Sequence, residues 1–551
     1  KPMQNIAELS KQTMKQREDY GHFDYVIVGA GTAGCALANR LSADPRNRVL
    51  LVEAGGSDNY IWTKIPVGYL YGMGNPRTDW GFKTAPAAGL NGRALNYPRG
   101  RILGGCSSIN GMIYMRGQAR DYDQWAQMGN VGWSWEEVLP YFKKSEDYFA
   151  GDDEMHGSGG EWRVEEQRLS WDILDYFKQA CVQAGIPETK DFNRGNNEGV
   201  GYFHVNQRKG WRWSSSRAFL TPIKSRKNLH LLTGAQAEHL TFSGRKVSGL
   251  AFFHHNQRCR VHADKEVILC SGAIGTPHLL QLSGVGAGNM LKSHGIAVHH
   301  ELDGVGKNLQ DHLQIRTIFK VKDITTLNSY AHKLSGKMRI ALEYLFKRSG
   351  PMSMAPSQLG AFVKSDKRLE TPDLQYHVQP LSLNAFGDPL HPFPAFTASV
   401  CNLRPQSRGQ VSLASANPFD SPEIAPNYLA DPHDRDIAAQ SIRVTRQIVS
   451  QAALAPFVTE EFLPGAEFET TEELAKKAGD ISTTIFHPVG TAKMGQDKTA
   501  VVDEKLRVHG LSGLRIADAS VMPAITSGNT NSPTLMIAEK AADLILTAHR
   551  R

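Results

Sequence analysis

The alternation of apolar and polar positions near the start of the chain predicts a strand, a helix and a second strand in close succession. Tyr25–Val28 is an apolar run of strand length, and the segment CALANRL, residues 35–41, has the small and apolar spacing of a helix. Val49–Val52 is the next apolar run of strand length. The order strand, turn, helix, strand is typical of an α/β fold.

Glycines occupy the turn between the first strand and the helix, in the spacing Gly29-x-Gly31-x-x-Gly34. Gly29 permits a tight turn, Gly31 lets the backbone approach a pyrophosphate, and Gly34 lets the helix pack on the strand. Glu53, after the second strand, lies 19 residues past Gly34, where an acidic residue binds a ribose hydroxyl. The pattern therefore predicts an adenine-dinucleotide site. It disfavours NADP, whose phosphate would stand at that hydroxyl.

Helix and strand patterns alternate further along the chain without internal repeats or low-complexity linkers, so we expect interleaved domains. Amphipathic spacing predicts helices over residues 133–148, 170–185, 434–450 and 471–477. Apolar, β-prone runs predict strands over residues 228–232, 247–254, 266–270, 374–378 and 397–402. The C-terminal part, from residue 483 onwards, has a glycine-rich and strand-like pattern.

Length and composition bound the class of protein. A chain of 551 residues with 41% hydrophobic residues is long enough for two or more domains. The net charge of +7 is modest and the basic residues are interspersed with acids, so nothing indicates a nucleic-acid partner. The six cysteines form no C-x-x-C pair, so neither a disulfide framework nor a metal site is predicted.

The sequence leaves the localisation open. No run of 18 or more apolar residues occurs, so no membrane span is predicted. The chain begins with Lys-Pro, and residues 1–21 form a polar lead that we interpret as trimmed or as the remainder after a targeting segment. We expect a cytoplasmic or peripheral membrane protein, with the periplasm as the alternative if a leader was removed.

Four further segments carry a family resemblance. They are GGCSSIN at 104–110, GAIGTPHLLQLSGVG at 272–286, FHPVGTAKMG at 486–495 and GNTNSPTLMIAEKAAD at 528–543. Together they resemble the glucose-methanol-choline (GMC) oxidoreductases, closest to choline dehydrogenases and to bacterial FAD-dependent alcohol dehydrogenases. The resemblance runs from about residue 22 to the C-terminus and implies FAD rather than NAD.

The resemblance also implies two interleaved domains. A Rossmann-like FAD-binding domain would be built from residues 22–160, 215–312 and 476–551. A substrate-binding domain, with a mainly antiparallel sheet flanked by helices, would be built from residues 161–214 and 313–475. By the same resemblance the FAD contacts are Gly29, Gly31, Thr32, Ala33, Gly34, Glu53, Cys106, Asn110, Gly111, Ile113, Ala237, Asp518, Thr530 and Asn531. Ile109 stands where choline oxidases carry a histidine bonded to the flavin, so the FAD is expected to be non-covalent.

The same resemblance assigns the chemistry. His487 matches the family's catalytic histidine, and an imidazole can accept the hydroxyl proton of an alcohol and later return it. Asn529 matches the second catalytic position, and its amide can hydrogen-bond the substrate oxygen. Phe486 and Gln358 are the predicted substrate contacts. Gln358 aligns with a glutamate of the choline-handling relatives, which weighs against choline because glutamine carries no charge.

The resulting prediction is an FAD-dependent dehydrogenase that oxidises a neutral primary alcohol to the aldehyde and passes electrons to a quinone or another acceptor. The nearest alternatives are an oxidase of the same family, which would use oxygen and produce hydrogen peroxide, and a choline dehydrogenase. An FAD-binding lyase without redox activity is the distant alternative.

Overall fold

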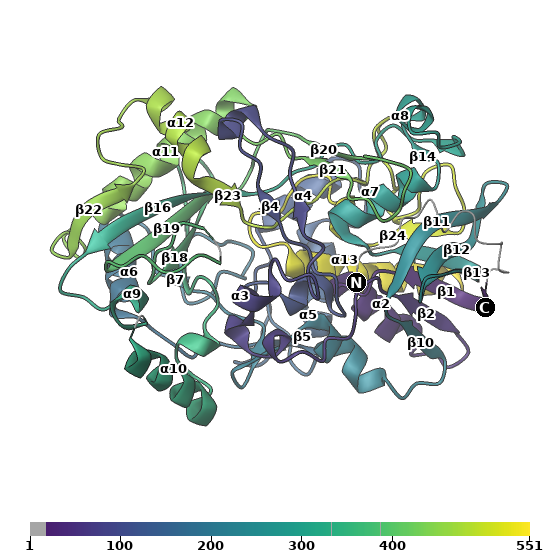
Figure 1. Ribbon diagram of the computed structural model, residues 1–551, viewed down its shortest axis with the longest axis horizontal. Coiled ribbons are helices and arrows are strands. Elements are labelled where there is room, and N and C mark those ends of the chain that lie inside the picture. Colours follow the sequence, from purple (N-terminus) through teal and green to yellow (C-terminus); the bar gives the residue numbers. More distant parts are fainter. Residues whose placement is uncertain (1–17, 332, 386, 551) are drawn as a thin grey trace.

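The computed structural model describes residues 18–331, 333–385 and 387–550. Two seven-stranded sheets lie towards opposite ends of its longest axis, with helices and loops between them (Figure 1). Each sheet takes strands from segments far apart in the sequence, so the chain crosses between the sheets several times. The interleaved α/β architecture predicted from the sequence is confirmed.

The first sheet contains the predicted strand–turn–helix–strand unit. Its strand order is β10-β2-β1-β13-β12-β11, and β24 also pairs with β13. The strands are β1 (Glu18–Val28), β2 (Val49–Val52), β10 (Leu229–Leu232), β11 (Ala235–Ser243), β12 (Lys246–His254), β13 (Gln257–Leu269) and β24 (Leu514–Ile516). All four residues of β2 are buried, as expected for a parallel strand covered on both faces.

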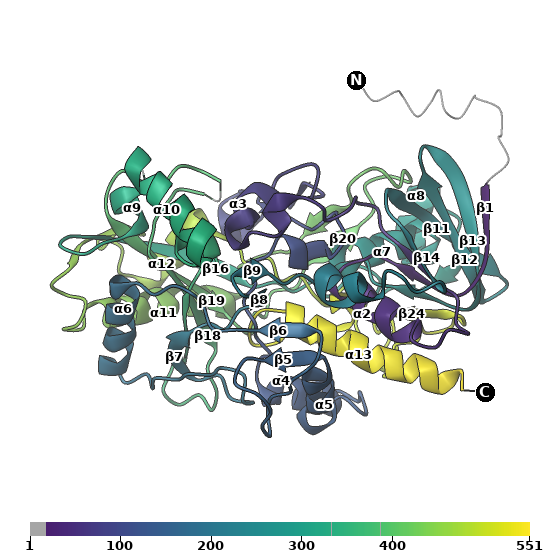
Figure 2. The ribbon, with the colours of Figure 1, turned by 90° about the horizontal axis from the view of Figure 1, so that it is seen from below.

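Two helices pack on one another beside the first sheet. α2 (Thr32–Leu41) follows β1 after the glycine turn, and α13 (Asn531–Ala548) packs against both α2 and α5 (Trp135–Ser145). α13 runs along the molecule in Figure 2 and ends near the C-terminus. The strand-like expectation for this segment is therefore wrong. Consecutive residues Leu535–Ala538 are all buried, and a helix buried on most sides lacks the polar stripe that reveals helical period.

The second sheet is antiparallel throughout, with the order β22-β16-β19-β18-β17-β7 and β23 paired to β16. Its strands are β7 (Gly199–Tyr202), β16 (Leu313–Val321), β17 (Leu359–Val363), β18 (Leu374–Gln379), β19 (Ala395–Asn402), β22 (Val458–Leu463) and β23 (Ser482–Thr484). β23 lies past residue 475, where the predicted substrate-binding domain ended.

The two faces of the second sheet differ sharply in polarity. Phe319, Tyr376 and Phe396 belong to an apolar core shared with α6 (Asp172–Gln183), α11 (Pro432–Val449) and α12 (Thr471–Ile481). Because side chains alternate along a strand, the residues between them point the other way. That face is polar yet buried, and it carries Gln314, Arg316, Gln375, His377 and Gln379. A buried polar face marks an interior surface that does more than pack.

The remaining helices and strands lie around the two sheets. The helices are α3 (Tyr69–Gly72), α4 (Ala119–Gln127), α7 (Gly272–Leu282), α8 (Gly288–Ser293), α9 (Leu327–Tyr330) and α10 (Leu334–Lys347). The short strand pairs are β3 (Phe82–Lys83) with β4 (Asn96–Tyr97), β5 (Glu146–Tyr148) with β6 (Trp162–Val164), β8 (Gln207–Arg208) with β9 (Trp211–Arg212), β14 (Val285–Gly286) with β15 (His300–Glu301), and β20 (Gln410–Ser412) with β21 (Glu423–Ala425).

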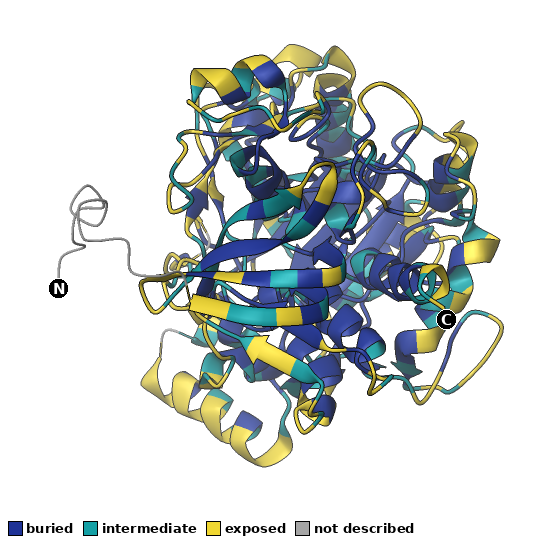
Figure 3. Cartoon of the chain, turned by 90° about the vertical axis from the view of Figure 1, so that its right-hand side faces the viewer, coloured by how far each residue is buried: buried dark blue, intermediate teal, exposed yellow. Residues whose placement is uncertain are grey.

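Burial separates the interior from the periphery (Figure 3). Dark blue predominates in the interior of the molecule, whereas the helix at the lower left, α10, is yellow over most of its length. No helix among the described residues is long and apolar enough to cross a membrane. Of the predicted polar lead, residues 1–17 lie outside the described part of the chain, and the next residues begin β1.

Candidate active site

A cavity of about 310 Å³ lies between the two sheets. Its lining combines the glycine turn after β1, the loop around residues 98–113, the start of α7, the polar face of the second sheet, and the segments 485–488 and 529–531. All the predicted site residues except Gly34 and Gln358 line this cavity. The structure therefore brings these six groups of residues, which are far apart in the sequence, to one place.

Gly29 and Gly34, at the two ends of the glycine turn, leave no room for a side chain. A Cβ on Gly29 would lie 2.5 Å from the carbonyl oxygen of Cys270, and a Cβ on Gly34 would lie 1.8 Å from that of Gly29. Gly34 thus packs helix on strand behind the cavity, as predicted. A Cβ on Gly105 would lie 2.7 Å from the Cα of Gly31. Bare backbone on both sides forms a cradle narrow enough for a pyrophosphate to meet amide groups directly.

The N-terminus of α2 opens into the same cradle. Gly31 is its N-cap residue and offers no side-chain cap, so the first amide groups of the helix are free to bind an anion. Thr32, at the first helical position, donates from its hydroxyl to Oδ1 of Asn531 at 2.6 Å. The predicted cofactor positions at the two ends of the chain are therefore joined directly.

Glu53 directly follows β2 at the edge of this cradle. Its Oε2 accepts a hydrogen bond from the backbone of Ala30 at 2.9 Å, and its Oε1 accepts one from Gly55 at 2.8 Å. Burial raises the pKa of Glu53 to about 7, and the two hydrogen bonds oppose this rise. The side chain lies in the cavity lining, where the sequence predicted a ribose contact.

Asp518 ties the C-terminal segment to α7. Its Oδ2 accepts from the backbone of Gly272 at 2.9 Å and from the hydroxyl of Thr276 at 2.6 Å. The carboxylate therefore caps the start of a helix that also faces the cavity. The other predicted cofactor positions that line the cavity are Ala33, Cys106, Asn110, Gly111, Ile113, Ala237 and Thr530.

The backbone of His487 is held by a buried carboxylate. Asp311 Oδ1 accepts from the amide of His487 at 2.8 Å. Its Oδ2 accepts from Tyr97 at 2.9 Å, from Thr484 at 2.6 Å and from Tyr428. Burial raises the pKa of Asp311, whereas the donors from Thr484, Tyr428 and Tyr97 lower it. This dense set of bonds leaves the His487 backbone little freedom to move.

Phe486, the predicted substrate contact beside His487, lines the cavity and adopts a positive φ of 72°. A bulky residue in this region is strained. Arg99 stabilises the turn by donating to the carbonyl oxygen of Phe486 at 2.7 Å. The strained turn directs the imidazole of His487 into the cavity.

Hydrogen bonds define the tautomer of His487. Nε2 of His312 lies 3.1 Å from the carbonyl oxygen of Leu403, so it must carry a hydrogen. Burial lowers the pKa of His312 to about 4, so its ring is neutral and its Nδ1 is an acceptor. Nδ1 of His487 lies 3.0 Å from that atom and must donate. The lone pair of His487 is therefore on Nε2.

Asn529 faces this lone pair. Its Nδ2 lies 3.2 Å from Nε2 of His487, and its Oδ1 accepts from Nε2 of Gln375 at 3.2 Å. Because Gln375 holds the oxygen, the amide nitrogen of Asn529 is turned towards the histidine. The two predicted catalytic residues thus present an acceptor and a donor to the same part of the cavity.

The electrostatic surroundings keep His487 neutral. Burial lowers its pKa well below the ordinary value, and His312, His377 and Arg99 lower it further. A neutral imidazole at physiological pH can act as a proton acceptor. The sequence predicted this residue type and place but not the three neighbours that set its protonation.

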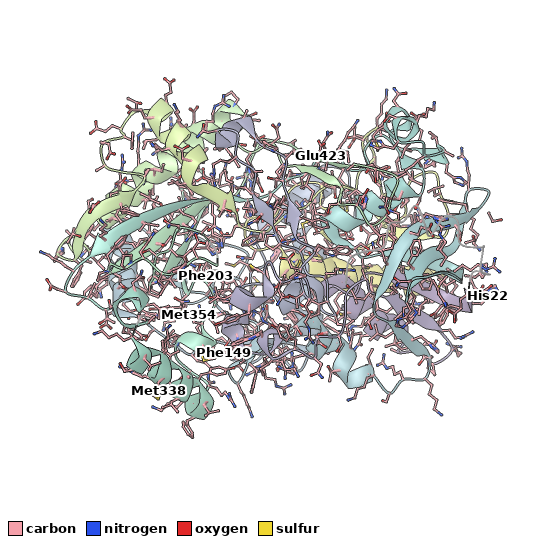
Figure 4. The ribbon with its side chains drawn as sticks, in the orientation of Figure 1. His22, Phe149, Phe203, Met338, Met354 and Glu423 are labelled. Carbon is pink, nitrogen blue, oxygen red and sulfur yellow. The ribbon has the colours of Figure 1, made fainter. Side chains whose placement is uncertain are left out.

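Gln358 does not contact the cavity, contrary to the expectation from the sequence. Its side-chain amide donates to the backbone carbonyl oxygen of Ala355. The backbone carbonyl oxygen of Gln358 accepts from the backbone amide of Phe203 at 2.9 Å. Phe203 is labelled on the second-sheet side of the molecule in Figure 4. The neighbouring residues Pro356 and Ser357 line the cavity instead.

Arg316 is a cavity residue that the sequence reasoning missed. It lies on the polar face of β16, is buried, and has a pKa lowered to about 10 by burial, so it remains charged at neutral pH. The alternation of His312, Gln314 and Arg316 with apolar Leu313 and Ile315 is a signal that could have revealed a strand with a polar inner face.

Comparison with known proteins identifies the class that this fold and site define. Two models of GMC oxidoreductase match residues 23–314 and 405–538. The chain belongs to the GMC oxidoreductase family, as the four sequence segments indicated. Members of this family bind FAD.

Relatives and a solved structure narrow the comparison. The chain is 42% identical to an alcohol dehydrogenase [acceptor] of Pseudomonas putida, over 95% of this chain and 96% of the relative. It is 39% identical to an oxygen-dependent choline dehydrogenase of Vibrio vulnificus, over 95% and 94%. An FAD-dependent oxidoreductase from Chaetomium thermophilum superposes with a TM-score of 0.88 at 27% identity, over 96% of this chain and 100% of that one.

Proposed function

We propose that the protein oxidises a neutral alcohol to the aldehyde, with FAD bound in the cavity between the sheets and His487 as the base. The observation that carries this proposal is the pairing of Nε2 of His487 with the amide of Asn529 at 3.2 Å. The pair lies in the same cavity as the glycine cradle and Glu53.

The residues present fit an adenine dinucleotide. A Cβ on Gly29 or Gly105 would meet backbone, and a Cβ on Gly31 would project into the open space of the cradle. The uncapped start of α2 suits a pyrophosphate. When bound, FAD supplies the hydride acceptor for the carbinol carbon. Ile109 is buried, lines the cavity and has no nucleophilic atom, which supports non-covalent binding.

The chain's own residues handle the hydroxyl group. Nε2 of His487 accepts the hydroxyl proton because its lone pair is fixed there and its ring is neutral. The amide of Asn529 donates to the substrate oxygen and stabilises the charge that develops on it. A positioned base contributes roughly 10²–10⁴ in rate, and a donor to a developing oxyanion contributes roughly 10²–10³.

The charges of the lining favour a neutral alcohol over choline. The lining contains three carboxylates. Glu53 and Asp518 come from the first-sheet side of the cavity, and Asp420 comes from a loop that packs on the first sheet. The polar face of the second sheet contributes Arg316 and no carboxylate to the lining. Two like charges about 8 Å apart repel by about 2 kcal/mol at an effective dielectric of ~20. A quaternary ammonium would therefore be bound poorly.

We further propose a quinone or a similar carrier as the electron acceptor. The 42% identity to an alcohol dehydrogenase [acceptor] supports this choice, whereas the name of the Vibrio relative favours oxygen as the second candidate. Mixing the anaerobically reduced enzyme with oxygen or with a soluble quinone analogue in a stopped-flow instrument distinguishes them. Faster reoxidation by oxygen would favour the oxidase alternative.

The central test compares flavin reduction in the parent and in His487→Ala. A panel of aliphatic, aryl and polyol alcohols is mixed with each enzyme without oxygen, and flavin bleaching is followed at the flavin absorbance. We expect the substitution to slow bleaching and to leave the flavin bound. His433→Ala, at an exposed histidine of α11, is the matched control. A parent enzyme that no alcohol bleaches would contradict the proposal.

A further inference from the structure

The outer face of α10 is apolar although it points to solvent. Leu334 and Phe346 are each 78% exposed, Leu345 58%, Met338 56% and Leu342 47%. These residues are spaced at three and four positions, so they form one stripe along the helix. α10 is the yellow helix in Figure 3, and Met338 is labelled at the lower edge of the molecule in Figure 4.

The opposite face holds the helix to the protein. Tyr344 is buried and donates from its hydroxyl to the carbonyl oxygen of Gly210 at 2.9 Å. A Cβ on Gly336 would lie 2.2 Å from the carbonyl oxygen of Tyr330, so the helix approaches the body closely there. A surface helix ordinarily buries its apolar stripe. In α10 the orientation is reversed, which calls for a partner outside the chain.

A second group of exposed apolar residues lies beside α10. Ile61 and Tyr71 are about half exposed and Leu70 is 41% exposed. They belong to the 3-10 helix 61–63 and to α3, which lies next to α10 in both Figure 1 and Figure 2. The turn 351–353, which follows α10 after three residues, contacts the turn 66–68 that directly precedes α3. We call these eight residues of α10, α3 and the 3-10 helix the α10 face.

Basic side chains surround the stripe. Lys333, Lys337, Arg339 and Lys347 are exposed and form no ion pair with any described residue, whereas Glu343 is the one acidic residue of the helix. At 100° per residue, Lys337 and Arg339 stand on the two sides of the stripe, and Lys333 and Lys347 stand at its ends. The apolar stripe is thus bordered by positive charge.

We propose that the α10 face docks the protein onto a bilayer surface that contains anionic phospholipid, with α10 lying in the plane of the headgroups. An apolar stripe edged by Lys and Arg is the pattern of interfacial helices. The apolar residues enter the acyl boundary and the four cations meet lipid phosphates. A second copy of this chain fits less well, because two α10 faces would bring like charges together.

Docking on this face also brings the membrane close to the cavity. Met73, the residue directly after α3, lines the cavity. A lipid-soluble alcohol or quinone would then have a short path from the bilayer to the site. This consequence rests on the proposed function, whereas the docking itself does not.

The test is cosedimentation of the full-length protein with vesicles of phosphatidylcholine, prepared with and without phosphatidylglycerol. We expect binding to the anionic vesicles that weakens at high salt. Leu345→Gln with Phe346→Gln should weaken this binding at least 10-fold, and Lys337→Gln with Arg339→Gln should weaken it several-fold. Val131→Gln, at a residue that is 77% exposed elsewhere, is the matched control and should bind like the parent.

Two further readouts separate the outcomes. Alcohol oxidation with a water-soluble acceptor should be equal in all these variants, and its failure in the parent would contradict the proposed function without touching the docking. A parent that stays in the supernatant with anionic vesicles overturns the docking. So does a parent dimer in sedimentation velocity that the Leu345/Phe346 double substitution dissociates, because the face would then be a self-association surface.

Discussion

The Nδ1 atoms of His312 and His487 face one another at 3.0 Å. Two such nitrogens form a hydrogen bond when one carries a hydrogen and the other does not. The carbonyl of Leu403 decides which, because it accepts from Nε2 of His312 at 3.1 Å. His312 is therefore a positioning residue: it sets the tautomer of the proposed base without contacting the substrate.

The first prediction follows from this pair. In His312→Ala the Nδ1 hydrogen of His487 loses its acceptor, so we expect flavin reduction to slow by roughly 10- to 100-fold with FAD still bound. The acidic limb of the kcat/KM profile should also move to higher pH, because His312 lowers the pKa of His487. His312→Asn, which keeps an acceptor oxygen, should recover part of the rate. An unchanged pH profile would show that His312 merely fills space.

The second prediction concerns Asn529. Asn529→Ala removes the donor to the substrate oxygen, and we expect kcat for flavin reduction to fall roughly 10²-fold while the KM changes less. Gln375→Leu frees the oxygen of Asn529, whose bond to Gln375 is 3.2 Å long, and should give a smaller loss of the same kind. Single-turnover kinetics measure both. If Asn529→Ala and Gln375→Leu both lost bound flavin to the same extent, the slower reaction would indicate a structural defect instead.

The third prediction is a dependence of stability on acid. Burial lowers the pKa of His312 to about 4 and that of His377 to about 3. The unfolded chain binds these protons near pH 6.5 and the folded chain does not, so stability is present above pH 6.5 and is lost as the pH falls towards 4. For His312 the loss is about 3 kcal/mol, since one pKa unit corresponds to about 1.4 kcal/mol.

Thermal unfolding between pH 7 and pH 4 checks this sign. Glu53 acts in the opposite direction, because its raised pKa of about 7 favours folding at low pH and that contribution is lost as the pH rises. His377→Gln removes one neutral buried histidine, so its Tm should fall less steeply with acid than that of the parent. A Tm that rises on acidification would contradict the argument.

Local sequence predicted the dinucleotide half of the site because its determinants are contiguous. Residues 25–53 contain the strand, turn, helix and acid in one stretch, so the role of each glycine could be assigned from its place in the motif. His487 and Asn529 were reached through their motifs. The contact between His312 and His487 spans 175 positions. No local sequence pattern predicts which distant strand will pack beside a given loop.

Gln358 shows that matching a residue to a family position does not reveal which way its side chain points. It directly precedes β17, and in a strand adjacent positions face opposite sides, so a residue beside the cavity in sequence can point away from it. Ser357 lines the cavity and Gln358 does not. The apolar stripe of α10 was missed for a related reason, because the sequence shows a helical period without showing which side meets the protein.

The fourth prediction is that FAD leaves the protein without bond cleavage. Ile109 occupies the lining with an aliphatic side chain that cannot bond to the flavin ring. Acid precipitation should release the yellow cofactor into the supernatant, where its mass and spectrum identify FAD. A pellet that retains the colour after washing would contradict non-covalent binding.

The fifth prediction concerns the charge of the substrate and rests on Arg316. Its guanidinium belongs to the lining and stays protonated at neutral pH. Choline and 3,3-dimethylbutan-1-ol have the same shape and differ in charge, so the ratio of their kcat/KM values reports the electrostatic term. We expect the neutral alcohol to be preferred by roughly 10-fold or more, from about 2 kcal/mol of repulsion.

Two substitutions make this comparison specific. Arg316→Gln removes the charge at similar length, so it should narrow the preference mainly by improving choline. Gln358→Glu should leave the ratio nearly unchanged, because that side chain turns towards Ala355 and away from the cavity. If Gln358→Glu improved choline and Arg316→Gln did not, the substrate would bind beside residue 358. The charge on β16 would then have no part in selectivity.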